Sequence, residues 1–207
     1  MSWISLEQLV SAVQSQQALI SFPTDTVPAL AAAPTAAEQI YTFKQRPPDK
    51  PLILMGASFA DLSLYIAGSE TERLAWQAVT AQHWPGPLTL VLPASDRLPP
   101  VMNPTQDETI GIRVPNQPLA QALLSQTGPL ATTSVNLSGQ PPLQSLAEVA
   151  QRFPQLLMLS EDAIQALQAR SNVDLRTAAA KASGIPSTVA KWTDGQWLIL
   201  RQGAVRL

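Results

Sequence analysis

The chain has 207 residues, with 19 prolines, 9 glycines, a single histidine (His83) and no cysteine. The lack of cysteine excludes disulfides, thiolate nucleophiles and cysteine-ligated metals, and one histidine cannot build a multi-histidine metal site. Charged residues make up 14% of the chain, and 13 basic against 15 acidic residues give a net charge of −2. This balance argues against a general nucleic-acid coat, so any anion site must be local.

The length and the 45% content of hydrophobic residues fit one globular domain spanning residues 1–207. The longest uncharged run, Val114–Ala147, is interrupted by prolines, amides and hydroxyls, and we therefore predict no membrane span. The N-terminus carries Glu7 and glutamines instead of the basic start and apolar stretch of a secretory leader. We expect a cytoplasmic protein.

Hydrophobic periodicity, capping residues and proline or glycine stops predict strands that alternate with helices. In the first part of the chain, we predict a helix at 6–16 opened by a Ser5–Gln8 capping box, a strand at 18–22, a helix from a Thr35–Glu38 box to Pro47–Pro48, and a strand at 51–55. Helices capped by Ser58 and Ser69 follow, then strands at 88–92 and 109–114, a helix at 117–126 stopped by Gly128, and a strand at 129–133. The last part is predicted to hold a helix capped by Ser145, a strand at 156–159, one or two helices within 161–182, and a hairpin of 187–190 with 197–200. Alternating elements followed by a hairpin at Asp194–Gly195 predict an α/β domain with a mixed sheet.

Polar stretches follow several predicted strands, where open α/β sheets usually bind ligands. Pro23-Thr-Asp-Thr26 follows the strand at 18–22, Trp84-Pro-Gly-Pro-Leu-Thr89 is a stiff turn that leads into the strand at 88–92, and Thr132-Thr-Ser-Val-Asn-Leu-Ser-Gly139 runs on from the strand at 129–133. Each is also compatible with a plain turn whose side chains satisfy its own backbone. The third is the least generic, since five of its eight residues carry a side-chain hydroxyl or amide, which suits a neutral cradle for phosphate or ribose.

Basic residues form one cluster, in which Lys44, Arg46 and Lys50 fall within seven positions. Cations at a helix C-terminus complement the helix dipole, whereas Lys and Arg together can also clamp a phosphate. Arg113 lies near the end of an apolar strand, so its charge must be either paired or directed at a ligand. His83 has no motif partner, and we interpret it as structural.

In this order, the motifs resemble the YrdC/Sua5 family of threonylcarbamoyl-AMP synthases. The matching stretches are Pro23-Thr-Asp-Thr-Val27, Lys44-Gln-Arg46, Pro51-Leu-Ile53, Trp84-Pro-Gly-Pro-Leu-Thr89, Gly111-Ile-Arg-Val-Pro115 and Ser134-Val-Asn-Leu-Ser-Gly139, followed by Ser187-Thr-Val189 and Leu200-Arg201-Gln-Gly203. No single motif is specific, but their shared order is. The resemblance implies the short, single-domain form of the family, with a twisted, mixed open sheet flanked by helices and a concave, positively charged pocket.

The resemblance also implies a reaction and its partners. L-Threonine and bicarbonate give a carbamate that attacks the α-phosphate of ATP, releasing pyrophosphate and leaving threonylcarbamoyl-AMP. Downstream proteins then transfer the threonylcarbamoyl group to a tRNA adenosine, and a weak contact with RNA is a further expectation. Mg²⁺ is expected to accompany ATP, although no acidic cluster marks a protein-built metal site.

The family's motifs imply roles for individual residues. Lys44 and Arg46 correspond to its catalytic cations. The implied ATP and phosphate contacts are Lys44, Arg46, Thr89, Ser134, Asn136 and Ser138. The implied threonine contacts are Thr24, Thr26, Arg113 and Thr132.

Two other functions stay open. Pro28-Ala29 stands where the family usually carries an aromatic residue and glycine. A carbamoyl-adenylate-forming enzyme with another acceptor, or a diverged member that binds nucleotide or double-stranded RNA without this catalysis, is therefore the alternative to a threonine-using synthase.

Overall fold

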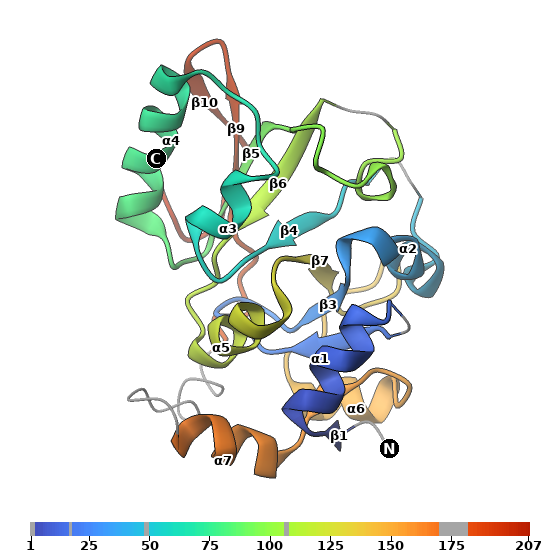
Figure 1. Ribbon diagram of the computed structural model, residues 1–207. Coiled ribbons are helices and arrows are strands. Elements are labelled where there is room, and N and C mark those ends of the chain that lie inside the picture. The colour runs from blue at the N-terminus through green and yellow to red at the C-terminus, as the bar shows by residue number, and fades with distance from the viewer. Residues whose placement is uncertain (1–2, 17, 48–49, 106–107, 170–181) are drawn as a thin grey trace.

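The computed structural model describes residues 3–16, 18–47, 50–105, 108–169 and 182–207 (Figure 1). The strands are β1 (Trp3–Ile4), β2 (Ile20–Phe22), β3 (Ala29–Ala32), β4 (Ile53–Met55), β5 (Leu88–Pro93), β6 (Thr109–Arg113), β7 (Leu130–Ser134), β8 (Met158–Leu159), β9 (Thr188–Thr193) and β10 (Gln196–Arg201). The helices are α1 (Leu6–Gln14), α2 (Glu38–Lys44), α3 (Phe59–Ser63), α4 (Glu70–His83), α5 (Pro118–Thr127), α6 (Leu146–Arg152) and α7 (Glu161–Ala169), with short 3-10 turns η1 (Pro34–Ala36) and η2 (Pro100–Met102).

Eight strands form one sheet in the order β10-β9-β5-β6-β4-β7-β3-β2, and β1 pairs with β8 separately. Within the large sheet, β4 is parallel to β6 and β5 is parallel to β9, while the remaining neighbours are antiparallel. The sheet is therefore mixed, which confirms the predicted α/β class.

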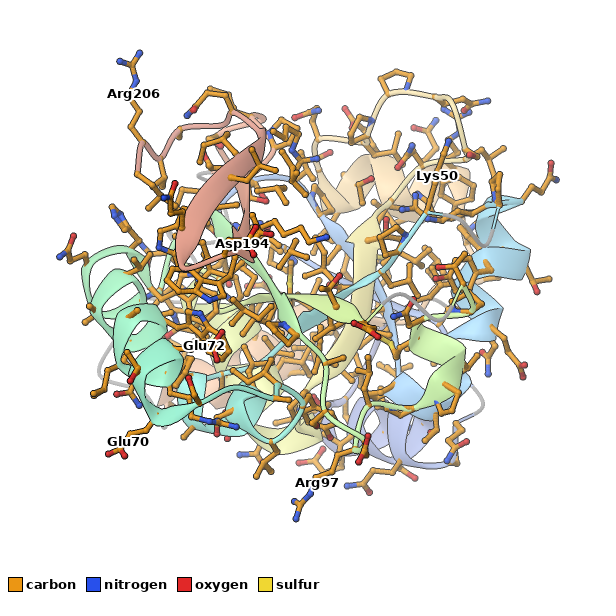
Figure 2. All side chains as sticks on the ribbon, turned by 90° about the horizontal axis from the view of Figure 1, so that it is seen from above. Lys50, Glu70, Glu72, Arg97, Asp194 and Arg206 are labelled. Carbon is orange, nitrogen blue, oxygen red and sulfur yellow. The ribbon has the colours of Figure 1, made fainter. Side chains whose placement is uncertain are left out.

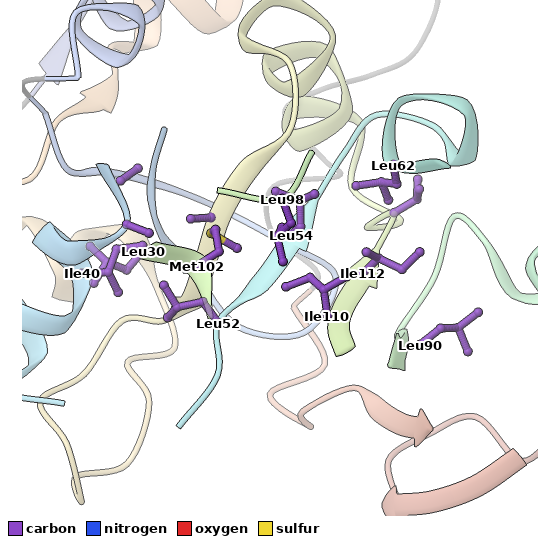
Figure 3. Packing of buried hydrophobic residues seen from close by; sticks show 14 of the residues in the cluster. Leu30, Ile40, Leu52, Leu54, Leu62, Leu90, Leu98, Met102, Ile110 and Ile112 are labelled. Atoms are coloured by element: carbon purple, nitrogen blue, oxygen red, sulfur yellow. The ribbon is translucent and has the colours of Figure 1, made fainter. Parts of the chain in front are cut away.

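One face of this sheet is apolar and buried from β3 across to β9, whereas the edge strand β10 is largely exposed. Because side chains alternate between the two faces of a strand, every second residue of the central strands enters the same core. Buried members from the sheet are Leu30, Leu54, Leu90, Ile110, Ile112, Ala131 and Ala190. They pack against side chains such as Ile40 of α2, Leu62 of α3, Trp76 of α4 and Val149 of α6, and Figure 3 shows part of this packing.

The opposite face is covered over only part of its width. Leu9 and Val13 of α1 and Leu123 of α5 form a second buried cluster with Ala29 and Ala31 of β3, and α7 adds to it. On β5, β6 and β9, the residues that alternate with the first core belong to neither cluster. They are Thr89, Val91, Thr109, Gly111, Arg113, Val189 and Lys191. This part of the sheet is left open as a cavity.

Local signals predict most helix starts and the closing hairpin. Ser5, Ser58, Ser69 and Ser145 all accept a hydrogen bond from the backbone three residues on, as predicted. In the hairpin turn, Asp194 and Gly195 have φ angles of 49° and 76°, the left-handed conformations that a tight two-residue turn requires.

Two predictions fail at the start of the chain. No capping box forms at Thr35, because Pro34–Ala36 adopts a 3-10 turn and α2 begins after Ala37 without a side-chain cap. Strand β3 was not predicted, since Ala29-Leu-Ala-Ala32 lacks the β-branched and aromatic residues typical of strands. It is a strand because β2 and β7 pair with it on both sides. Of the helical stretch predicted within 161–182, Glu161–Ala169 is helical and residues 170–181 lie outside the described residues.

Charged side chains such as Glu70, Arg97 and Arg206 project from the periphery of the molecule (Figure 2). Within the described residues, no helix combines the length and the apolar character needed to cross a membrane.

The Ser69 cap gives a test of local stability. Replacing Ser69 with Ala removes the acceptor for the Glu72 amide and one half of the capping box at the start of α4. We expect a loss of about 1 kcal/mol in the free energy of unfolding, measured by chemical denaturation. Ser125→Ala, inside α5 at an exposed position, is the matched control and should change stability by no more than about 0.5 kcal/mol. Equal effects of the two substitutions would contradict the capping role.

Candidate active site

A cavity of about 820 Å³ lies over the open part of the sheet. Its walls come from seven strands and from five loops: the β2–β3 loop, the segments after α2, before β6 and before β9, and the β7–α6 loop. This volume is typical of a site for a ligand larger than a single amino acid.

The floor of the cavity is a row of neighbouring residues from five strands. Register places Lys191 beside Val91, Val91 beside Gly111, Gly111 beside Ile53 and Ile53 beside Thr132. Because Gly111 has no side chain, the middle of this row is its lowest point. A Cβ added there would stand 3.4 Å from Ile53 Cγ1 and 3.5 Å from Thr89 Cγ2, so the strand itself would tolerate it.

The charged residues that line the cavity are mostly basic. They are Arg46, Lys50, Arg113, Lys191 and Arg201, against one acidic residue, Glu108. In a chain with only 13 basic residues, this is a marked concentration of cations.

Six of the residues predicted from the motifs line this cavity. They are Thr26, Arg46, Thr89, Arg113, Thr132 and Ser134. The other four, Thr24, Lys44, Asn136 and Ser138, do not line it but lie in or next to its supporting loops. The roles of all ten toward substrates stay predictions.

Arg113 is held in place from three sides, although only 3% of it is exposed. Its Nε donates to Gly86 O at 3.1 Å, Nη1 to Thr26 Oγ1 at 3.0 Å and Nη2 to Asp25 Oδ1 at 2.6 Å. Burial lowers the pKa of Arg113 and the Asp25 carboxylate raises it, while Arg201 lowers it further. The charge is therefore paired, the side chain also lines the cavity, and its contact with a ligand stays a prediction.

Gly86 explains the motif between Trp84 and Thr89. A Cβ at Gly86 would lie 2.1 Å from the carbonyl oxygen of His83, a distance that no side chain tolerates. The Gly86 amide donates to Val114 O, and its carbonyl accepts from Arg113. The stiff Pro-Gly-Pro turn thus brings backbone close to β6 and supplies one of the three groups that hold Arg113.

The hydroxyls of Thr24 and Thr26 form a directed chain behind Arg113. Thr24 Oγ1 donates to Val27 O at 2.7 Å and accepts from the Thr26 amide, so the contact of 3.0 Å between the two hydroxyls requires Thr26 as the donor. Thr26 Oγ1 then accepts from Arg113. Thr24 is fully used inside the protein and lines a smaller neighbouring cavity, whereas Thr26 lines the main one.

Lys44 lies behind the cavity wall with 1% of its surface exposed. Its Nζ donates to Ser134 O at 2.6 Å, to Asn136 O at 2.7 Å and to Asn136 Oδ1 at 2.8 Å, which uses all three N–H groups. Burial, and to a lesser extent repulsion from Arg46, lowers the pKa of Lys44 to about 7. In this arrangement Lys44 fixes the loop that follows β7.

That loop is further closed by its own side chains. Asn136 Oδ1 accepts from Ser134 Oγ at 2.6 Å as well as from Lys44, and Asn136 Nδ2 donates to Leu137 O and Gln140 O. The Ser138 amide donates to Lys44 O. These polar residues therefore support one another, and of the three Ser134 borders the cavity whereas Asn136 and Ser138 do not.

A second polar group in the cavity wall comes from the closing hairpin. Thr89 Oγ1 lies 2.8 Å from Ser187 Oγ, which also accepts from Arg201 Nη2 at 3.2 Å, and Arg201 Nε donates to Ser187 O. Burial lowers the pKa of Arg201. Neither Ser187 nor Arg201 was among the predicted site residues. The sequence did offer a signal, because both residues lie in stretches that match the family and in or directly beside the predicted hairpin. Once β9 of that hairpin pairs with β5, both residues lie near Thr89.

Arg46 lines the cavity from the segment after α2 and is braced by backbone carbonyls. Its Nε donates to Lys50 O at 3.0 Å and its Nη2 to Pro51 O at 3.1 Å. Among the described residues, no group of three or more His, Cys, Asp or Glu side chains could hold a metal ion.

The lowered pKa of Lys44 predicts a pH-dependent contribution to stability. In the unfolded chain Lys44 keeps its proton up to about pH 10.5, so between pH 7 and pH 10 the unfolded state binds more protons than the folded state. The stability that depends on Lys44 therefore rises with pH over this range. Lys44→Met should cost roughly 1–3 kcal/mol at pH 7 by leaving buried oxygens without their donor, and this cost should grow toward pH 10. Urea denaturation of both proteins at several pH values measures the gap; a gap that shrinks with rising pH would contradict the assignment.

Comparison with known proteins places this arrangement in a family. A sequence model of the Sua5/YciO/YrdC family, described as "Telomere recombination", matches residues 12–203. A threonylcarbamoyl-AMP synthase of Photobacterium profundum is 37% identical over 149 residues, which is 70% of this chain and 79% of the relative.

Solved structures agree. P. abyssi Sua5 in complex with L-threonine superimposes with a TM-score of 0.76 and 29% identity, covering 96% of this chain. The chain spans only 54% of the length of that Sua5. E. coli YciO gives a TM-score of 0.75 with 26% identity and covers 96% of this chain and 88% of YciO. The chain belongs to the Sua5/YciO/YrdC family.

Proposed function

We propose that this protein is an L-threonylcarbamoyladenylate synthase, a nucleotidyltransferase that joins L-threonine, bicarbonate and ATP and releases pyrophosphate. The observation that carries the proposal is the cavity, where three arginines and several hydroxyls surround a sheet floor without competing acidic clusters. The relatives named threonylcarbamoyl-AMP synthase, and the Sua5 that binds L-threonine, support it.

The chemistry suits these residues. The amino group of threonine and bicarbonate form a carbamate and release water, and one carbamate oxygen then attacks the α-phosphorus of ATP. The bond between the α-phosphorus and the oxygen that bridges the α- and β-phosphates breaks, and pyrophosphate leaves with that oxygen. Such a displacement needs positioning and stabilisation of negative charge more than it needs a covalent nucleophile, which fits a cavity of cations and hydroxyls.

We assign the fixed groups of the cavity to the parts of the substrates. Arg113 takes the carboxylate of threonine, with Thr26 and Thr132 beside it. Arg46 and Ser134 face the phosphates from one side, and Thr89, Ser187 and Arg201 face the nucleotide from the other. Lys44, Asn136 and Ser138 hold the loop that carries Ser134, and Thr24 holds Thr26.

Magnesium enters this proposal only with ATP. The described residues offer no carboxylate cluster for it, so the triphosphate would supply its ligands. We further propose a single-domain, cytoplasmic enzyme whose product passes to proteins that transfer the threonylcarbamoyl group to tRNA. The net charge of −2 gives no support to RNA binding as the main function.

Purified protein supplied with ATP, bicarbonate and L-threonine tests the function through release of pyrophosphate. Release must depend on both threonine and bicarbonate. Faster release with another amino acid would favour a different acceptor, which Pro28–Ala29 leaves open. No release, together with salt-sensitive binding of double-stranded RNA, would favour the non-catalytic alternative.

Arg46→Ala should lose roughly 2–4 kcal/mol of transition-state stabilisation, because it removes a fixed cation from the phosphate side of the cavity. The measurement is kcat/KM for pyrophosphate release. Arg97→Ala removes an exposed cation away from the cavity and is the matched control. Full activity of the Arg46 variant would contradict the phosphate assignment.

Gly111→Val tests whether the cavity floor is the substrate site. The added side chain would rise from the middle of the floor, and its Cβ would make ordinary van der Waals contacts of 3.4 Å with Ile53 and 3.5 Å with Thr89. We expect binding of ATP or threonine to weaken by about tenfold or more, with little change in the melting temperature. Titration calorimetry measures the affinity, and unchanged binding of both substrates would exclude this floor as their site.

A further inference from the structure

We propose that Asp25 is a positioning residue that aims the Arg113 guanidinium into the cavity, so that two of its N–H groups face the carboxylate of the amino-acid substrate. The identity of that substrate rests on the proposed function. Asp25 itself does not line the cavity, and its carboxylate is bonded to Arg113, which does.

The hydrogen bonds inside the protein use only some of the N–H groups of Arg113. A guanidinium has five N–H groups, and the hydrogen bonds to Gly86, Thr26 and Asp25 use three of them. Each of the two terminal nitrogens makes one of these bonds and therefore keeps one further N–H group. In the described part of the chain no acceptor bonds these two, and Arg113 borders the cavity. Two N–H groups on one guanidinium match the two oxygens of a carboxylate.

The three hydrogen bonds that hold Arg113 differ in strength. Gly86 O and Thr26 Oγ1 are neutral acceptors at 3.1 and 3.0 Å, whereas Asp25 Oδ1 carries charge and lies at 2.6 Å. Charge-assisted bonds are roughly twice as strong as neutral ones. Asp25 therefore dominates the orientation of the guanidinium about its long axis.

Asp25 is itself held in place by backbone amides. The Asn116 amide donates to Asp25 Oδ1 at 3.1 Å, and the Ser183 amide donates to the carbonyl of Asp25. Within the described residues, Asp25 Oδ2 is buried and has no hydrogen-bond partner. A carboxylate that only served folding would more usually satisfy both oxygens, since an unbonded buried oxygen is costly. Here one oxygen is committed to Arg113 and the backbone, and the pair holds a buried cation at the edge of a ligand cavity.

The test compares Asp25→Ala, Asp25→Asn and Asp96→Asn. Asp25→Asn keeps an acceptor oxygen but loses the charge, and Asp96→Asn removes a charge from an exposed turn as the matched control. The activity-independent readout is the set of Arg113 side-chain N–H signals in ¹⁵N NMR, assigned with Arg113→Lys. In the wild type, restrained rotation should give resolved Nη signals that shift on addition of L-threonine but not of L-threoninol, which lacks the carboxylate.

We expect Asp25→Ala to collapse these signals into an averaged one and to raise the KM for threonine by about tenfold or more, with the KM for ATP changed less than about twofold. Asp25→Asn should fall between Asp25→Ala and the wild type, and Asp96→Asn should match the wild type. Unchanged Arg113 signals in Asp25→Ala, or changed signals with an unchanged KM for threonine, would overturn the inference. If the wild type turns over without threonine, the proposed function fails, and the NMR comparison still decides whether Asp25 positions Arg113. Melting curves and the KM for ATP separate these outcomes from misfolding.

Discussion

The alternation of side chains along the central strands is the constraint on which the rest of the structure depends. Leu90, Ile112 and Ala190 must enter the apolar core on one face of the sheet. Their neighbours Thr89, Gly111, Arg113 and Lys191 are then forced to the opposite face. Helices α1, α5 and α7 cover only the β2–β3 side of that second face. The cavity follows from this partial cover, and its position in the sheet follows from strand order.

Charge is used sparingly and locally. The chain has few charged residues, yet five basic side chains line one cavity. Such a cluster is costly unless each cation is restrained or meets an anion. Arg113 meets Asp25, while Arg201 is held by the carbonyl and the hydroxyl of Ser187, which are neutral. The cavity is thus suited to a ligand that brings negative charge with it.

Lys44 shows how a motif residue can serve a site without touching the ligand. The resemblance implies a phosphate contact, but the three donors of Lys44 are bonded to the loop that ends β7. Its effect on a ligand at Ser134 would pass through the shape of that loop. A rearrangement of the loop on binding would be needed before Lys44 could reach a phosphate.

The sequence predicts the parts of the fold that local chemistry decides. Serine caps and the Asp194–Gly195 turn depend on neighbouring residues, and both lie where expected. Strand β3 was missed because only its partners β2 and β7 make an alanine-rich segment extended. For the same reason, Ser187 and Arg201 could not be assigned to the site from spacing, since long-range strand pairing brings them to Thr89.

The two interpretations of Arg113, as a paired charge or as a ligand contact, show how far the sequence can predict the role of a single residue. Its position in an apolar strand predicts that the charge must be paired or directed at a ligand. That it can do both depends on Asp25, which is 88 positions away in the chain, and on Gly86. Contacts between residues so far apart in the chain leave no pattern in the sequence around either residue.

The central claim is that one cavity brings threonine, a carbon from bicarbonate and an adenylate together. Mass spectrometry of the products formed from ATP, ¹³C-bicarbonate and L-threonine tests it most directly. We predict one adenylate that contains one labelled carbon and one threonine. An adenylate that lacks either the label or threonine, or the absence of any adenylate product, would contradict the account.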